Sequence, residues 1–311
     1  MLRILTVFLL LCVPVLQSCQ QQTASKPLVV STIKPVQALV YAVAGGDQGA
    51  IALHQLLPDG ASPHHYALKP SDRRLLEQAS AVFYVGEGLE NFLSKSLSNL
   101  APDTQRVALA QAQGIQHLHA RRQAETAHDD GHETHKDGED WHVWLNPVNA
   151  IAMTHQIAQV LSEIDPPNRE LYQRNAALLV QRINATDERI KAQLAAVKTR
   201  PYLAFHDAWQ HFDTHYELKF AGAVTLDVSR LPGARHVQDI RNLITERKAV
   251  CLFQEPQFPP ALVKTLAEGT DLRIGELDPL GMKIPLNADT YPALLQSAAD
   301  SFTQCLSVTT P

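Results

Sequence analysis

An uninterrupted helical pattern from Asp165 to Lys198 constrains the fold of this chain more than any other feature. Asp165 followed by proline is a typical helix start, and beyond Pro167 the stretch contains neither glycine nor proline. Its apolar residues recur at spacings of three, four and seven: Tyr172, Ala176, Leu179, Ile183, Ile190, Leu194 and Val197. This spacing places them on one face of a helix, and about 33 residues rising ~1.5 Å each form a rod of roughly 50 Å. A flexible linker would be rich in Gly and Ser, so residues 165–198 predict one long rigid helix joining two lobes.

Short apolar runs alternate with helical segments on both sides of this helix. Strands are expected at 28–33, 51–57 and 81–85 before it, and at 202–206, 217–224, 249–254 and 272–277 after it. Helices are expected at 36–44, 70–79, from Leu89, after Pro147, from Asp207, and at 233–247, 260–268 and 288–306. The alternation predicts an α/β fold of two similar lobes, each a mostly parallel sheet flanked by helices. The lobes span residues 27–160 and 200–311.

Length and composition agree with two domains and exclude one class of partner. The chain has 311 residues, of which 45% are hydrophobic and 19% charged, enough to form a large core. The pI is near 6.3 and no long basic run is present, which argues against nucleic acid as the partner.

The N-terminus has the pattern of an export signal. Arg3 is followed by the uncharged run 4–16, which is too short to span a bilayer and suits a signal peptide over residues 1–18. Residues 16–19, Leu-Gln-Ser-Cys, resemble a bacterial lipobox, which makes Cys19 the candidate lipid anchor and new N-terminus. Gln17 is unusual there, so simple secretion is the alternative. Either way the mature protein is expected to be periplasmic or extracytoplasmic, with a lipid as its sole membrane attachment.

The cysteines fit the same compartment. Of the four cysteines, Cys12 leaves with the signal and Cys19 is the candidate anchor, so Cys251 and Cys305 remain as a pair. In an oxidising compartment a disulfide between them is expected. Two buried free thiols are the alternative.

A histidine-rich acidic segment interrupts the first lobe at residues 117–140. With His142, which follows it, it holds six of the fourteen histidines: His117, His119, His128, His132, His135 and His142. Its seven acidic and three basic residues make it too polar to bury a core, so most of it is expected to be a mobile loop. Tracts of this composition are typical of metal collection, although a solvated insert without function is the simpler interpretation. Apolar residues 143–145 place His142 where the chain re-enters a core.

Three other side chains follow predicted strands: His64, His206 and Asp278. Ligands of open α/β sheets bind beyond the carboxyl ends of the strands, so these three and His142 are expected where the lobes meet. The spacings of 78 and 64 residues between the three histidines match no local zinc motif. Residues 132–135 (HETH) are one residue shorter than the zincin motif HExxH, so the sequence does not support a zincin. His211 and His215, four apart on a predicted helix, are interpreted as a surface pair, and a second ion site is the alternative.

Five ordered segments together resemble one family. Residues 60–71 (GASPHHYALKPS), 142–147 (HVWLNP) and 205–208 (FHDA) are similar to the three histidine-ligand segments of the metal-binding solute-binding proteins of ABC importers. Residues 255–258 (EPQF) and 277–281 (LDPLG) are similar to two further segments of that family. The resemblance covers nearly all of 27–311 and implies two α/β lobes joined by one long helix, in agreement with the periodicity.

The resemblance also implies a ligand set of His64, His142, His206 and the oxygen ligand Asp278. Manganese- and iron-binding relatives carry Glu at the position of His206, and three imidazoles favour zinc. The acidic His-rich insert and a cysteine pair in the second lobe are typical of the zinc branch. Some zinc relatives have Glu where this chain has Pro63, which leaves Asp278 or a water as the fourth ligand.

The implied function is capture of Zn²⁺ between the lobes and its delivery to an ABC permease with its ATPase. The protein is expected to be a monomer. It is not expected to be an enzyme, because a closed ligand shell leaves no position to activate water. A weak auxiliary metal collector is expected at His117, His119, His128, His132 and His135. The alternatives are a manganese or iron carrier of the same fold, a zinc hydrolase, and a surface zinc buffer or adhesin.

Overall fold

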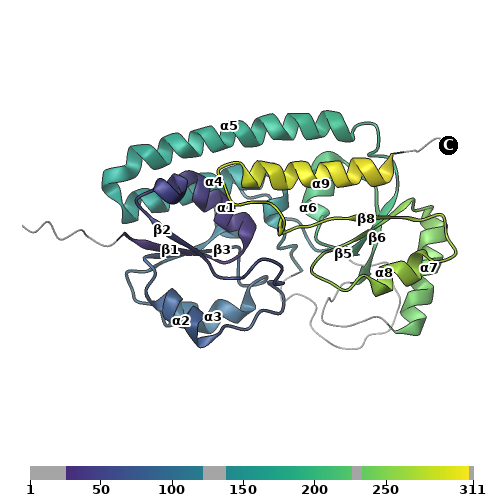
Figure 1. The fold of residues 1–311 in the computed structure, drawn as a ribbon, viewed down its shortest axis with the longest axis horizontal. Helices are drawn as coiled ribbons and strands as arrows, with labels where there is room; N and C mark the ends of the chain where they lie inside the picture. Colours follow the sequence, from purple (N-terminus) through teal and green to yellow (C-terminus); the bar gives the residue numbers. More distant parts are fainter. Residues whose placement is uncertain (1–25, 122–137, 226–232, 308–311) are drawn as a thin grey trace, which may run out of the picture.

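The computed structural model describes residues 26–121, 138–225 and 233–307 as two α/β lobes side by side (Figure 1). The expected signal peptide 1–18, the candidate anchor Cys19 and the three insert histidines His128, His132 and His135 lie outside the described residues.

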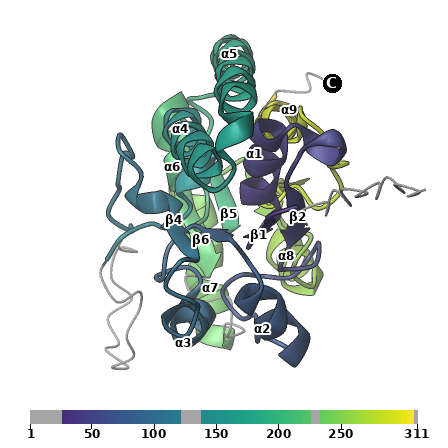
Figure 2. The same cartoon turned by 90° about the vertical axis from the view of Figure 1, so that its left-hand side faces the viewer.

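The first lobe is built on a four-stranded parallel sheet with the order β2-β1-β3-β4. Its strands are β1 (Leu28–Ser31), β2 (Ala52–Gln55), β3 (Ala81–Tyr84) and β4 (Gln105–Ala108). Its helices include α1 (Lys34–Ala44), α2 (Pro70–Glu77), α3 (Ser94–Ser98) and α4 (Pro147–Ile164). Figure 2 shows α1 and α4 on one side of the sheet and α2 and α3 on the other, as expected for a parallel sheet buried on both faces.

The second lobe repeats this arrangement with the strand order β6-β5-β7-β8, again all parallel. Its strands are β5 (Tyr202–His206), β6 (Phe220–Thr225), β7 (Cys251–Gln254) and β8 (Arg273–Glu276). Its helices are α6 (Gln210–Tyr216), α7 (Ala234–Arg247), α8 (Ala261–Ala267) and α9 (Thr290–Leu306). The prediction of two similar lobes with parallel sheets is confirmed.

Two elements of the first lobe differ from the sequence prediction. Strand β4 was not expected, because Gln105 and Arg106 are exposed and only Val107 is buried, so the strand has no apolar pattern. The helix expected from Leu89 is shorter: a 3₁₀ turn (Asn91–Leu93) leads into the five-residue α3.

The long helix is present but begins later than expected. A 3₁₀ turn (Pro166–Asn168) precedes α5 (Arg169–Leu194), whose buried face includes Tyr172 and Leu179 of the predicted stripe. Asp165 does not cap the backbone; its carboxylate accepts hydrogen bonds from Tyr172 Oη at 2.5 Å and from Asn168 Nδ2 at 2.8 Å. The carboxylate therefore fixes the turn between α4 and α5 through side chains.

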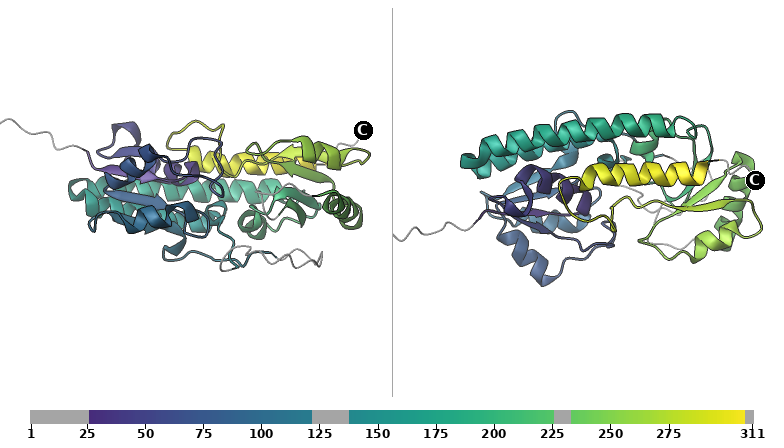
Figure 3. Two further views of the ribbon diagram at one scale, coloured as in Figure 1. Left: turned by 90° about the horizontal axis from the view of Figure 1, so that it is seen from below. Right: turned by 45° about the horizontal axis from the view of Figure 1, so that its top comes forward.

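Helices α5 and α9 run side by side across both lobes (Figures 1 and 3). Helix α5 contacts α1 and α4 of the first lobe and α6 of the second, and α9 contacts α5 and α1. The main hydrophobic core is continuous between lobes and includes Val29 of β1 and Phe253 of β7. The predicted disulfide is present and joins Cys251 of β7 to Cys305 of α9. The two lobes are therefore packed into one body.

The disulfide should contribute measurably to stability. Replacing both residues, Cys251→Ala with Cys305→Ala, is expected to lower the free energy of unfolding by about 4 kcal/mol, because the bond closes a long loop in the unfolded chain. Its sequence separation is 54 residues. Urea unfolding followed by circular dichroism measures the loss, and reduction of the wild type should reproduce it. An unchanged unfolding midpoint in both experiments would contradict this role.

Candidate metal site

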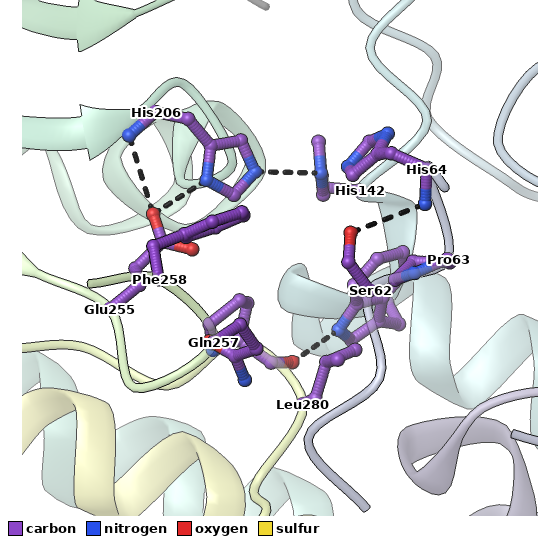
Figure 4. Close-up of a pocket in the computed structure, with 11 residues that line it drawn as sticks. Ser62, Pro63, His64, His142, His206, Glu255, Gln257, Phe258 and Leu280 are labelled. Atoms are coloured by element: carbon purple, nitrogen blue, oxygen red, sulfur yellow. Dashed lines mark hydrogen bonds and ion pairs between the residues drawn. The ribbon is translucent and has the colours of Figure 1, made fainter. Parts of the chain in front are cut away.

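Three histidines from both lobes meet in a small pocket between them (Figure 4). His64 lies on the loop between β2 and α2, His142 immediately precedes the 3₁₀ turn Val143–Leu145, and His206 is the last residue of β5. One ring nitrogen of each lies within 4.8 Å of the others, and this is the one such group among the described residues. The structure thus brings together three of the four residues that the sequence analysis nominated.

The spacing of the imidazoles suits a tetrahedral ion. The Nε2 atoms of His142 and His206 are 3.4 Å apart. Two imidazole nitrogens bound to one zinc at ~2.0–2.1 Å with a tetrahedral angle are separated by about 3.3–3.4 Å. The His64 ring centroid lies 5.4 Å from that of His142 and 5.6 Å from that of His206. The pocket can therefore hold an ion among the three rings without a large movement.

Two buried carboxylates orient His142 and His206, the two more deeply buried histidines of the three. Asp140 Oδ1 lies 2.7 Å from His142 Nδ1, and Glu255 Oε1 lies 2.5 Å from His206 Nδ1. A carboxylate that accepts a hydrogen bond from Nδ1–H keeps the Nε2 lone pair free for a metal. Such a carboxylate is the usual outer partner of a metal-binding histidine. Glu255 follows β7 next to β5, at the position where the sheet's strand order reverses.

The carboxylate beside His206 also shifts its protonation. Burial by itself would lower the pKa of His206, but the negative charge and hydrogen bond of Glu255 raise it, and the net shift is upward from 6.5. Protons therefore compete for this imidazole more strongly than for an ordinary exposed histidine.

The remaining pocket lining is mostly apolar and includes Pro63, Trp144, Phe258 and Leu280. Trp144 also joins the lobes: its Nε1 donates to the Pro279 carbonyl at 2.8 Å, and its own carbonyl accepts from Tyr291 Oη at 2.5 Å. The apolar side chains limit the access of water to the imidazoles. The two hydrogen bonds of Trp144 hold the lobes together next to the pocket.

Asp278 is not brought into the histidine group. Its Oδ1 accepts from Gln257 Nε2 at 2.7 Å and from the Leu280 and Gly281 amides, while Oδ2 accepts from the Met282 amide at 2.6 Å. Asp278 or a water was expected as the fourth ligand. In the structure both carboxylate oxygens of Asp278 accept hydrogen bonds from the turn and from Gln257. Its carboxylate holds the turn that carries Leu280 to the pocket, because the backbone amides of that turn point at it.

The other histidines of the described chain contribute no ring nitrogen to this group, although the His65 ring centroid lies 6.3 Å from that of His64. His117 Nδ1 lies 3.6 Å from Glu139 Oε2, and His119 forms an antiparallel bridge with Glu139. The interpretation of His211 as a surface residue is wrong: it is fully buried, and its Nε2 lies 3.0 Å from the Asp140 carbonyl. His215 contacts Asp187 at 2.8 Å.

The sequence did not reveal the roles of Asp140 and Glu255 as partners of the histidines. It also did not reveal the packing of Trp141 on two glycines. Trp141, immediately before His142, packs against Gly86 and Gly88 so closely that a Cβ at Gly88 would lie 2.1 Å from the indole. The loop carrying these glycines is held by Glu90, whose Oε2 accepts from the Val85 and Gly86 amides at 2.8 and 2.9 Å. Burial raises the pKa of Glu90 to about 7, against the opposing effect of these bonds. The indole therefore needs two residues without side chains beneath it.

Two parallel α/β lobes spanned by one long helix, with three imidazoles at their interface, define the class of two-lobed metal-binding proteins. A family profile described as the periplasmic component A of the zinc-uptake complex, ZnuA, matches residues 29–305. The chain belongs to this family.

Several relatives bear the name of this family. The chain is 36% identical over 309 residues to the high-affinity zinc uptake system protein ZnuA of Brucella suis, covering 90% of this chain and 91% of the relative. It is 35% identical over 292 residues to the protein of the same name from Yersinia pestis, covering 89% and 91%.

Solved structures with lower identity share the fold. A crystal structure of a ZnuA aligns with a TM-score of 0.75 at 23% identity, over 90% of this chain and 99% of that one. The periplasmic zinc-binding protein TroA from Treponema pallidum aligns with a TM-score of 0.77 at 22% identity, over 91% and 100%. The expected family and fold are thereby confirmed.

The packing of Trp141 on Gly88 predicts a cost for the smallest substitution. Gly88→Ala should displace the indole and with it His142, lowering zinc affinity by about tenfold and stability by about 1–3 kcal/mol, as overpacking does. Competition with a fluorescent chelator and urea unfolding measure the two effects. Gly233→Ala, where a Cβ meets nothing within 4 Å, is the matched control. Equal zinc affinity in both variants would show that Trp141 does not position His142.

Proposed function

We propose that this protein captures Zn²⁺ between its lobes through His64, His142 and His206 and delivers it to an ABC permease driven by its ATPase. The observation that carries the proposal is the convergence of three imidazole nitrogens from both lobes within 4.8 Å. An ion bound there contacts both lobes, so binding joins them and release requires a shift between them.

The donor set supports zinc over manganese. Imidazole suits zinc, whereas manganese prefers carboxylate and carbonyl oxygens. The fold does not decide the metal, because a manganese-bound periplasmic protein from Candidatus Liberibacter asiaticus aligns with a TM-score of 0.74 at 20% identity. For the fourth ligand we favour a water, since both oxygens of Asp278 accept hydrogen bonds from the turn 278–282 and Gln257.

The surroundings of the site favour a zinc-binding transport protein over a zinc hydrolase. A zinc hydrolase needs a general base beside the metal-bound water. The carboxylates nearest the site, Asp140 and Glu255, each hold the Nδ1 atom of a histidine. Absence of turnover with generic ester and peptide substrates would agree with a carrier.

The family description gives a periplasmic component of a zinc-uptake complex. Within 26–121, 138–225 and 233–307, no helix is long and apolar enough to cross a membrane. We propose that residues 1–18 direct export, that Cys19 carries a lipid, and that the protein works as a monomer. For His117, His119, His128, His132 and His135 we propose weak zinc collection near the pocket.

The ligand assignment predicts one tight zinc per chain in the wild type. His64→Ala, His142→Ala and His206→Ala should each weaken zinc binding by about a hundredfold or more, equivalent to about 3 kcal/mol. Isothermal titration with chelator competition measures this, and His155→Ala, exposed on α4, is the control. Tight binding retained in all three variants would rule out the site. Manganese displacing zinc at equal concentration would instead support the manganese alternative.

Acidification should weaken zinc binding. Zinc takes the neutral imidazole, and the upward-shifted pKa of His206 means that this neutral form is lost as pH falls through a value above 6.5. Affinity should therefore be high at about pH 7.5 and lower by on the order of tenfold or more at about pH 5.5. Calorimetry at the two pH values measures the change. Unchanged affinity would contradict imidazole coordination.

The insert can be separated from the pocket by deletion. Removing residues 122–137 should leave one tight zinc, because His142 and its partner Asp140 are retained. It should reduce the weaker additional binding, because three of the five proposed collector histidines, His128, His132 and His135, are removed. Zinc titration of the deleted and complete proteins measures both classes of site. Loss of the tight site on deletion would place a principal ligand in the insert.

A further inference from the structure

The chain on either side of residues 122–137 forms a short antiparallel ribbon, defined here as residues 118–121 and 138–140. The Ala120 amide donates to the Gly138 carbonyl at 2.7 Å, and the Asp140 amide donates to the Leu118 carbonyl at 2.9 Å. In sequence the ribbon lies between β4 and His142. It therefore connects the first lobe directly to one of the proposed ligands.

One end of the ribbon is fixed to the first lobe through Gln116. The Gln116 amide donates to Asn149 Oδ1 at 2.7 Å, and its carbonyl accepts from Asn149 Nδ2 at 3.1 Å. Its side-chain Oε1 accepts from Asn146 Nδ2 at 3.1 Å. Both asparagines lie at the start of α4, so the ribbon leaves the first lobe from a fixed point.

The other end of the ribbon is bound to the second lobe through Arg121. Its guanidinium donates to Asp207 Oδ1 at 3.0 Å and to Asp213 Oδ2 at 2.7 Å. It also lies over the Phe220 ring, 4.1 Å from the centroid. The Asp213 side chain is only 1% exposed, so this is a charge-assisted contact largely removed from water. Asp207 directly follows the ligand His206.

Helix α6 of the second lobe adds two contacts to the ribbon backbone. Gln210 Nε2 donates to the His119 carbonyl at 2.8 Å, and His211 Nε2 lies 3.0 Å from the Asp140 carbonyl. Asp140 in turn accepts from His142 at both the backbone amide and Nδ1. A continuous series of contacts thus runs from Asp207 through Arg121 and the ribbon to His142.

On the basis of the proposed function, we propose that the ribbon is an inter-lobe clasp and that Arg121 is a positioning residue for zinc binding. Arg121 holds the segment after His206 and the segment before His142 in one arrangement, so the two Nε2 atoms are spaced for the ion before it arrives. Ligands held in place beforehand cost less to order on binding. Parting the lobes to release zinc requires the Arg121 contacts to loosen, so Arg121 also slows dissociation.

Arg121→Gln tests this directly. We expect zinc to dissociate about tenfold faster, with a corresponding loss of affinity and little change in the association rate, in the range seen when outer partners of metal ligands are removed. Stopped-flow transfer of zinc to a fluorescent chelator measures dissociation. Arg182→Gln is the matched control, because it removes an exposed contact with Asp289 far from the ribbon, and its rate should stay within about twofold of the wild type.

A second variant separates positioning from stability. Arg121→Gln leaves Asp213 buried without its cation, which destabilises the fold. Arg121→Gln combined with Asp213→Asn removes that charge, and this double variant carries the test if the single one does not fold. Faster zinc release from the folded double variant supports the clasp. Wild-type release and affinity, with only a lower unfolding temperature, would overturn it. A wild type that binds no zinc would instead overturn the proposed function.

Discussion

The packing of α9 along α5 and against α1 joins the two lobes into one body. Helix α9 ends the described chain of the second lobe, yet it lies against helices of the first, and the hydrophobic core runs through both lobes. The lobes therefore cannot swing apart as bodies on a flexible linker do. Motions compatible with this packing are small tilts and sliding of packed helices, together with shifts of the loops at the pocket.

This rigidity explains how a site divided between two lobes can be ready for its ion. Neither lobe alone holds three imidazoles, and two of the nitrogens already lie 3.4 Å apart across the interface. Asp140 and Glu255 fix the two rings, while Trp144 contacts the segment around Pro279 on the facing lobe. Binding then needs little rearrangement, and release can be produced by a small shift that removes one ligand. Such a site suits an ion that must be bound tightly and then handed over.

Much of the fold could be predicted because periodicity is a local property. The apolar stripe of α5 and the runs that form β1 and β5 are visible in the sequence, whereas β4 is not, since Gln105 and Arg106 face solvent at the sheet edge. His64 and His206 are predicted from their places after strands, His142 from its place where the insert re-enters a core, and all three from the family segments. The hydrogen bonds of Asp278 could not be predicted, because nothing local shows that the amides of 280–282 donate to its oxygens. The role of Glu255 and the burial of His211 depend on contacts between distant segments, which spacing does not reveal. Asp140 lies only two residues before His142, but it is one of seven acidic residues in the insert and nothing in the sequence distinguishes it from the others.

Coordination of zinc by imidazoles from both lobes underlies the proposed function. X-ray absorption at the zinc K-edge, on protein loaded with one equivalent of zinc, tests this most directly because it counts and identifies the ligands. We predict four nitrogen or oxygen neighbours at about 2.0–2.1 Å, with the outer-shell scattering of three imidazole rings. A spectrum with fewer than three imidazoles, or with a six-coordinate oxygen shell, would contradict coordination by His64, His142 and His206.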